Sequence, residues 1–128
     1  MNKRILQYFN EIEARLIECS AILSFQMIRK DISKNDGKIR VKAALMNGSA
    51  FECFLYIKDT GYEIQTLKYS FHWQNPDGTT IRRLDNAPHH LHLPNAPHHL
   101  HIGNDIVESF SENPDFFTFL DHIEISLR

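Results

Sequence analysis

Four turn sequences at close intervals constrain the fold of this chain more than any other feature. They are KNDG at 34–37, NG at 47–48, DTG at 59–61 and NPDG at 75–78. Asn-Gly and Asp-Gly pairs favour tight hairpins because these residues tolerate positive φ. The runs between the turns are apolar or alternating, and in KIRVKAAL basic residues 38, 40 and 42 alternate with apolar ones. Strands joined by short turns pair antiparallel, so we predict a meander of about five strands over residues 20–85.

Two helices are expected to bracket this sheet. Near the N-terminus an apolar residue recurs at helical spacing in a charged segment, which predicts an amphipathic helix over 1–18. Its apolar positions are Ile5, Phe9, Ile12 and Leu16. The C-terminal helix is predicted over 113–127, with Asn113 as N-cap, Pro114 as its first residue and Asp115 in its first turn. The predicted fold class is α+β, one domain over 1–128 with the helices on one face of the sheet.

Composition excludes several classes of protein. No apolar run is long enough to cross a membrane, and the charged N-terminus lacks the apolar core of a signal peptide, so we expect a cytoplasmic protein without membrane contact. Cys19 and Cys53 are expected to be buried thiols. Residues 1–61 carry ten Lys/Arg against seven Asp/Glu, and residues 104–128 carry one against six. This balance argues against tight, unassisted binding of nucleic acid.

A doubled motif follows the predicted sheet. NAPHHLH at 86–92 returns as NAPHHLH at 95–101, which places six histidines within thirteen residues. Proline cannot donate to a strand ladder, so Pro88, Pro94 and Pro97 predict a His/Pro-rich loop or edge segment over 86–103. In extended backbone His99 and His101 would share one side, and so would His90 and His92.

Three interpretations of the histidines compete. The spacing HxH can offer two imidazoles to a metal, but only Asp85 and Asp105 are nearby carboxylates, so we predict no cofactor and no resident metal. Histidines beside prolines also bond to free backbone carbonyls, which is a purely structural role. Burial of six neutral rings would need many partners, so we expect at least two to be functional.

The third interpretation is acid–base chemistry on RNA. Cleavage of a phosphodiester needs a base for the 2′-hydroxyl, an acid for the leaving oxygen and a cation for the phosphate. Imidazole suits the first two roles near neutral pH, and Arg82 or Arg83 suits the third. Tyr69 and His72 are expected on one face of the longest strand, where they could hold a base or a phosphate.

The segment YSFHWQNPDGTTIRRLDNAPHH, followed by PHHLHIG, resembles the TumE family, small toxins of type II toxin–antitoxin pairs. The family pattern is Tyr-x-Tyr/Phe-His, a Gly turn, RWDNAPHH and then PHHxH(V/I)G, and it covers residues 69–103. The matched positions are Tyr69, His72, Arg83, Asp85, Asn86, His89, His90, His98, His99 and His101. The chain departs from the pattern at Leu84, where Trp is common, and at Asn95-Ala96, where Thr/Asn-Phe is usual. Leu84 puts an aromatic role at that position in doubt.

The resemblance implies a growth inhibitor held in check by a cognate antitoxin, with RNA as the substrate. The residues assigned to catalysis are His72, Arg83, Asp85, His89, His98 and His101. Those assigned to substrate binding are Tyr69, Arg82, Asn86, His90 and His99. In this hypothesis Arg83 steadies phosphate charge, Asp85 orients a histidine, and two of His72, His89, His98 and His101 exchange protons.

Two alternatives stay open. One is a module, metal-loaded or not, that inhibits its target by contact alone. The other is a group-transferase toxin, against which the absence of a glycine-rich phosphate loop argues. The acidic C-terminal helix is a candidate surface for a basic antitoxin segment, and a homodimer is left open.

Overall fold

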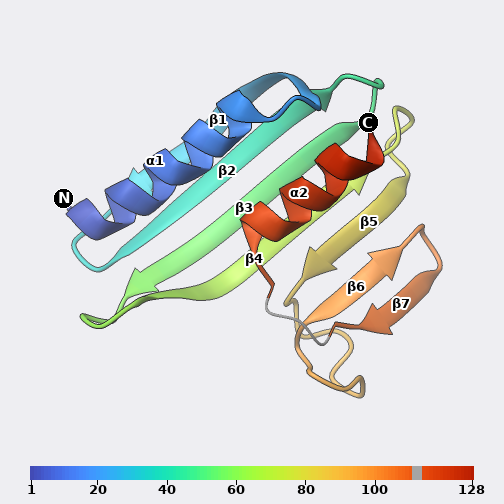
Figure 1. Ribbon diagram of the computed structural model, residues 1–128. Helices are drawn as coiled ribbons and strands as arrows, with labels where there is room; N and C mark the ends of the chain where they lie inside the picture. Colours follow the sequence, from blue (N-terminus) through green and yellow to red (C-terminus); the bar gives the residue numbers. More distant parts are fainter. Residues whose placement is uncertain (111–113) are drawn as a thin grey trace.

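The computed structural model describes residues 1–110 and 114–128 and consists of one antiparallel sheet with two helices (Figure 1). Its elements are α1 (Lys3–Glu18), β1 (Ile22–Ile32), β2 (Asp36–Leu45), β3 (Ala50–Asp59), β4 (Ile64–Gln74), β5 (Thr80–Asp85), β6 (His99–Ile102), β7 (Ile106–Ser109) and α2 (Phe116–Ser126). The strands lie in the sheet in the order in which they occur in the chain, and each neighbouring pair is antiparallel. The predicted α+β meander is therefore confirmed.

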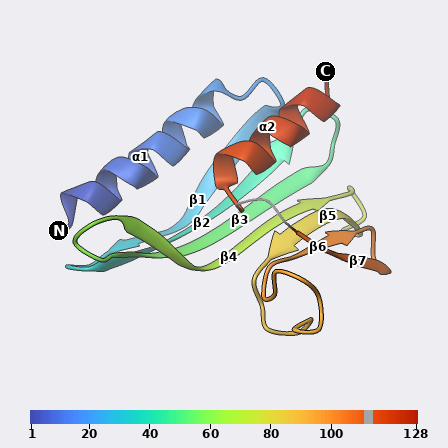
Figure 2. The ribbon, with the colours of Figure 1, turned by 60° about the horizontal axis from the view of Figure 1, so that its bottom comes forward.

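Both helices lie on the same side of the sheet (Figure 2). The predicted apolar positions of α1 are all buried, and Asn2 caps the helix by accepting a hydrogen bond from the backbone N–H of Ile5 at 2.9 Å. Gly37 lies beneath α1, where an added Cβ would come within 2.7 Å of Ile5 Cγ2, so this position requires a glycine. The core lies between the helices and the facing side chains of the sheet. We call the other side of the sheet, which neither helix covers, the open face.

Alternation along each strand separates the core from the open face. In β4, Tyr69, Phe71 and Trp73 are buried, whereas His72 and Gln74 are half-buried on the opposite side. Trp73 belongs to the core and donates from its indole N–H to Ser49 Oγ at 3.1 Å. Both cysteines are buried free thiols, as predicted.

The sheet has seven strands, and the prediction of about five was wrong. The prolines that argued against a strand all precede His99, so the HLHI segment after them is free to pair. It forms β6, which bonds to β5 on one side and β7 on the other. The expectation of a loop over all of 86–103 is therefore wrong for 99–102. The sequence of β7, IVES, is too short and lacks the alternating pattern that would predict a strand.

The C-terminal helix also begins later than predicted. Asp115 is its N-cap, in extended conformation, and accepts a hydrogen bond from the backbone N–H of Thr118 at 3.3 Å. Pro114 therefore precedes the cap, and Asp115 does not lie in the first turn. Asn113, the predicted cap, lies outside the described residues. Neither of the described helices is long and apolar enough to cross a membrane.

Candidate functional site

Two rows of side chains run across the strands on the open face, and the strand register defines them. The first row consists of Lys42, Glu52, His72, Arg83 and His101, each opposite the next on the neighbouring strand. The second row consists of Arg40, Phe54, Ser70, Asp85 and His99. Predicted site residues from β4, β5 and β6 therefore meet on one surface, although up to about thirty residues of chain separate them.

Arg83 lies at the centre of this cluster. Its Nε donates to Asp85 Oδ2 at 2.9 Å, and its Nη2 donates to His101 Nε2 at 3.0 Å. A guanidinium has no acceptor, so His101 must accept at Nε2 and carry its hydrogen at Nδ1. Burial and the positive charge of Arg83 lower the pKa of His101 to about 4, so its ring is neutral at pH 7.

Asp85 and His99 form a buried pair below this guanidinium. Asp85 is 6% exposed and His99 is 1% exposed, and His99 Nε2 lies 2.9 Å from Asp85 Oδ1. The other nitrogen of His99, Nδ1, lies 2.9 Å from the carbonyl oxygen of Pro97. Asp85 Oδ1 also accepts from the backbone N–H of Ala87 at 3.0 Å. The carboxylate thus fixes Arg83, His99 and the start of the loop in one arrangement.

His72 lies on the other side of Arg83. It is directly opposite Arg83 in the register of β4 and β5, and its Nε2 is 2.9 Å from Thr80 Oγ1. Burial, followed by the charge of Arg83, lowers the pKa of His72. A polar pocket of about 150 Å³ opens beside it. The pocket is lined by Arg40, Glu52, Phe54, Ser70, His72 and Arg83.

The loop between β5 and β6 adds the ring of His90 beside those of His99 and His101. The ring of His90 lies 4.8 Å from that of His99 and 5.8 Å from that of His101, measured between centroids. The loop curls on the side of the sheet away from the helices (Figure 2). One nitrogen from each of these three histidines lies within 4.8 Å of the others, which is a geometry that could hold a metal ion. Both nitrogens of His99 already face oxygen atoms, so a metal bound there would displace one of them.

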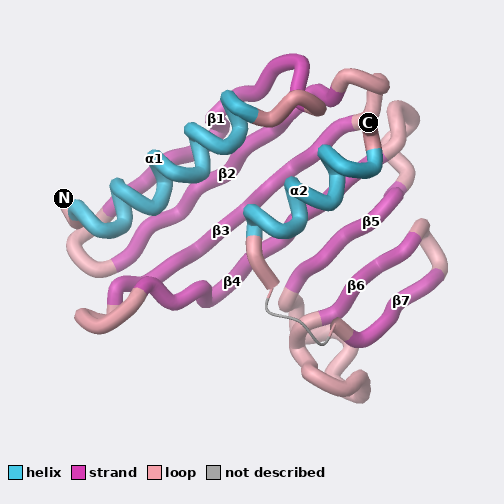
Figure 3. The backbone as a smooth tube through the Cα atoms, in the orientation of Figure 1, coloured by secondary structure: helices cyan, strands magenta, loops and turns pink. Residues whose placement is uncertain are grey.

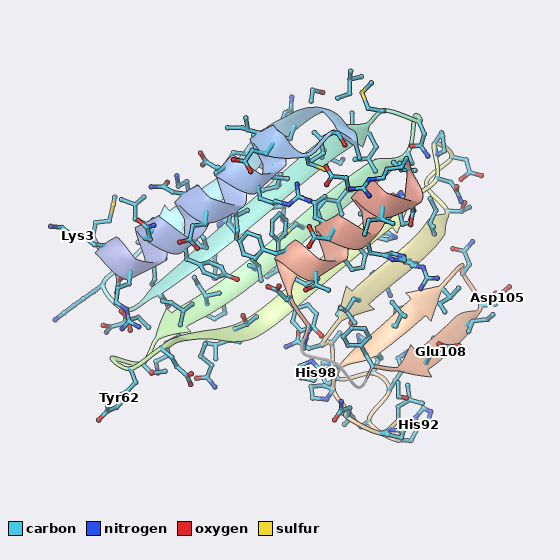
Figure 4. All side chains as sticks on the ribbon, viewed as in Figure 1. Lys3, Tyr62, His92, His98, Asp105 and Glu108 are labelled. Atoms are coloured by element: carbon cyan, nitrogen blue, oxygen red, sulfur yellow. The ribbon has the colours of Figure 1, made fainter. Side chains whose placement is uncertain are left out.

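Tyr69 and His98 form a separate pair on the helix side of the sheet. The Tyr69 hydroxyl lies 2.8 Å from His98 Nδ1, and the rings stack at 5.7 Å. The expectation that Tyr69 and His72 share a face is wrong, because residues three apart in a strand point to opposite sides. His98 lies close to the sheet, whereas His92 lies out on the loop (Figure 4).

Three further predicted residues lie apart from the cluster. Arg82 alternates with Arg83 and points to the helix side, where it lines a pocket of about 190 Å³ with His122. Asn86 is bonded at both ends of its amide, accepting from Tyr69 N at 3.1 Å and donating to the carbonyl of Leu67 at 3.0 Å. His89 is exposed in a turn of the loop.

A family model described as Toxin TumE matches residues 12–127, which is nearly the whole chain. The chain belongs to the TumE toxin family. No curated protein and no solved structure matches it.

In this TumE-family chain, sequence reasoning missed several residues that complete the site. Thr80 bonds to His72, while Glu52 and Phe54 line the pocket beside it. The sequence does contain a signal for Glu52 and Phe54. In the run AFECFLYI, alternation places them, with Tyr56, on the side of the strand opposite its core residues. The family match supports a toxin role.

Proposed function

We propose that this chain is the toxin of a type II toxin–antitoxin pair and that it inhibits growth by cleaving RNA at the open face. The observation that carries the proposal is the row His72–Arg83–His101, in which one guanidinium stands between two imidazoles. The row faces away from the hydrophobic core and borders a polar pocket. This is the set of groups that phosphodiester cleavage needs.

The proposed reaction uses the 2′-hydroxyl of the RNA as the nucleophile. One of His72 and His101 takes the hydroxyl proton as the 2′-oxygen attacks phosphorus, and the other delivers a proton to the departing 5′-oxygen. Arg83 stabilises the negative charge that builds on the phosphate oxygens. The products are a 2′,3′-cyclic phosphate and a free 5′-hydroxyl.

The charge of Arg83 also links substrate binding to proton transfer. In the free protein this charge lowers the pKa of both His72 and His101. A bound phosphate partly neutralises the guanidinium and adds negative charge beside both rings. The pKa of each imidazole then rises, so that one of them can hold the proton that the leaving oxygen receives.

Asp85 and His99 act as positioning residues in this mechanism. They are too buried to touch RNA, but together they hold Arg83 and the base of the loop. The cognate antitoxin is proposed to act by protein–protein contact. A small DNA-binding type of protein encoded beside this chain would support the pairing.

The test is incubation of the purified protein with total RNA, with and without a chelator. Cleavage that survives chelation and disappears in His72→Ala and His101→Ala supports the proposal, provided that both variants stay folded. His92→Ala, on the exposed part of the loop, is the matched control. Full cleavage by either of the two active-site variants would refute the assignment.

A second candidate function rests on the close approach of His90, His99 and His101. In it the cluster binds a divalent metal of the zinc type, and the protein acts as a metal enzyme or inhibits a target by contact. Cleavage that is lost on chelation would favour the metal enzyme. The absence of any cleavage, with growth inhibition retained, would favour inhibition by contact.

A further inference from the structure

The open face carries an aromatic and basic area beside the proposed catalytic row. We call Lys38, Arg40, Phe54 and Tyr56 the platform. Lys38 lies opposite Tyr56 and Arg40 opposite Phe54 in the register of β2 and β3. The ammonium of Lys38 is 5.0 Å from the centre of the Tyr56 ring, and the guanidinium of Arg40 is 4.7 Å from that of Phe54. Each ring therefore has a cation over its face.

The fold itself does not explain these two rings. Core residues of β3 are Phe51, Cys53, Leu55 and Ile57, which point toward the helices. Phe54 and Tyr56 point to the opposite side and are half-buried, so they contribute little to the core. The Tyr56 hydroxyl donates to Asp36 Oδ2 at 2.9 Å, which holds the end of the ring in place.

The charge of this area is suited to an anionic partner. Lys38, Arg40 and Lys42 follow one another on the open side of β2, and Lys42 is exposed. Two acids lie beside them: Glu52 is paired with Arg40 at 2.9 Å, and Asp36 accepts the hydrogen bond from the Tyr56 hydroxyl. The chain as a whole has a net charge of −2, so this local excess of positive charge is a property of the face and not of the composition.

The platform is continuous with the proposed catalytic row. Arg40, Glu52 and Phe54 form one side of the polar pocket whose other side is Ser70, His72 and Arg83. Phe54 in β3 and Arg83 in β5 are two strands apart, which is about 10 Å at the usual spacing between strands. A strand of RNA whose phosphate meets Arg83 would therefore pass over Phe54 within a few nucleotides.

We propose that the platform binds unpaired RNA next to the phosphate that is cleaved, an inference that rests on the proposed function. Successive bases stack on Phe54 and Tyr56, while Lys38, Arg40 and Lys42 meet the backbone phosphates. Aromatic rings beside cations are a common way to bind single strands, because every base has a face that can stack. In a duplex the bases are already stacked on one another, so the platform selects single-stranded RNA.

The test measures binding separately from cleavage. The probe is a short fluorescent oligouridine with 2′-O-methyl groups, which lacks the nucleophile and stays intact on the wild-type protein. Phe54→Ala and Tyr56→Ala are each expected to weaken binding roughly 10-fold. Lys42→Ala is expected to reduce the slope of log affinity against log salt by about 0.7.

Matched controls exist elsewhere on the chain. Tyr62 is 95% exposed in the turn between β3 and β4, and Lys3 lies on α1, across the sheet from the platform (Figure 4). Tyr62→Ala and Lys3→Ala are expected to bind the probe as the wild type does. Phe54→Leu keeps an apolar side chain without a ring, so weakened binding by this variant, with an unchanged thermal unfolding midpoint, excludes misfolding as the cause.

Two results would overturn the platform proposal alone. One is cleavage of RNA at the proposed row together with undiminished probe binding by Phe54→Ala and Tyr56→Ala. The other is loss of antitoxin binding in these variants while the probe still binds, which would assign the face to a protein partner. A third result would separate the two proposals. If Phe54→Ala and Tyr56→Ala weaken binding of the probe but the wild-type protein cleaves no RNA, the platform proposal stands and the proposed catalysis is refuted. Equal affinity for duplex RNA would overturn the selection of single strands.

Discussion

The two copies of NAPHHLH have the same residues and very different surroundings. The first copy lies in turns of the loop, where His89 and His92 are exposed. The second copy enters the sheet as strand β6 (Figure 3). There His99 is buried against Asp85, and His101 is bonded to Arg83. Equivalent positions in the two copies are 89 and 98, 90 and 99, and 92 and 101.

The difference shows that strand pairing, rather than the motif itself, decides which of these histidines lie opposite Arg83 and Asp85. Pairing with β5 places the second copy opposite Arg83 and Asp85. The first copy begins directly after those same residues, where the chain leaves the sheet. Only His90 returns to the cluster, through contacts between rings. Substitutions at equivalent positions of the two copies therefore test this comparison directly.

The largest expected difference is between His101 and its counterpart His92. His101→Ala removes a proposed proton-transfer group and an acceptor of Arg83, so RNA cleavage should fall roughly 100-fold or more. His92→Ala should leave the rate unchanged, because that ring is exposed on the loop. Initial rates on a labelled RNA measure both. Similar rates for the two variants would show that the copies are equivalent in function.

The pH dependence of stability is a second test of the difference between His101 and His92. The folded state lowers the pKa of His101 from 6.5 to about 4, so between these values the unfolded chain binds more protons than the folded one. The free energy of unfolding should therefore decrease as the pH falls from about 6.5 to 4, with at most about 3 kcal/mol from this residue.

In His101→Asn that part of the pH dependence should disappear, since an amide can still accept from Arg83 but does not titrate. His92→Asn is the control and should keep the wild-type profile. Urea unfolding at a series of pH values provides the measurement. A profile unchanged by His101→Asn would contradict the lowered pKa.

The next difference is between His99 and His90. His99→Ala leaves the buried Asp85 with one partner fewer and opens a cavity, which should lower the free energy of unfolding by about 2–3 kcal/mol. His90→Ala should cost less than about 1 kcal/mol, since its half-buried ring makes no side-chain hydrogen bond among the described residues. Chemical denaturation at pH 7 measures both. A larger loss of unfolding free energy in His90→Ala than in His99→Ala would show that the first copy, and not the second, contributes more to stability.

The smallest difference is between His98 and His89. His98→Ala deprives the Tyr69 hydroxyl of its partner and should cost about 1 kcal/mol. His89→Ala should change stability by less than about 0.5 kcal/mol. Neither should change the rate of RNA cleavage, because His98 lies on the helix side and His89 on the exposed turn. A folded His98→Ala protein without activity would show that the helix side takes part in the chemistry.

Much of the fold could be predicted because local sequence determines it. The turns and the apolar spacing of α1 depend on neighbours a few residues apart, and the structure confirms all four hairpins and the buried face of α1. In the first hairpin Asp36 and Gly37 already belong to β2, so its turn ends earlier than the predicted 34–37. The start of α2 could not be located, because Asn113 and Asp115 are equally good caps by residue type. The choice of Asp115 depends on where the helix packs, which local sequence does not encode.

The sequence predicts many of the residues that form the candidate site but not how they are arranged on the sheet. The sequence places Arg83, Asp85 and the histidines within a short stretch, so their meeting was expected. Their division between two faces depends on the register of β4, β5 and β6, which brings His72, Arg83 and His101 together and leaves Tyr69 with His98. A side chain such as Thr80 carries no chemical signature in the sequence, and its bond to His72 becomes visible only when the strands are paired.

Strand β4 contributes Trp73 to the interior and His72 to the exterior from adjacent positions. If β4 paired with its neighbours one residue out of register, these two side chains would exchange sides. The imidazole would then lie in the hydrophobic core and the indole would face solvent. Such a chain would lose core packing and, under the proposed function, also the catalytic row. Stability and activity would then depend on the same strand register.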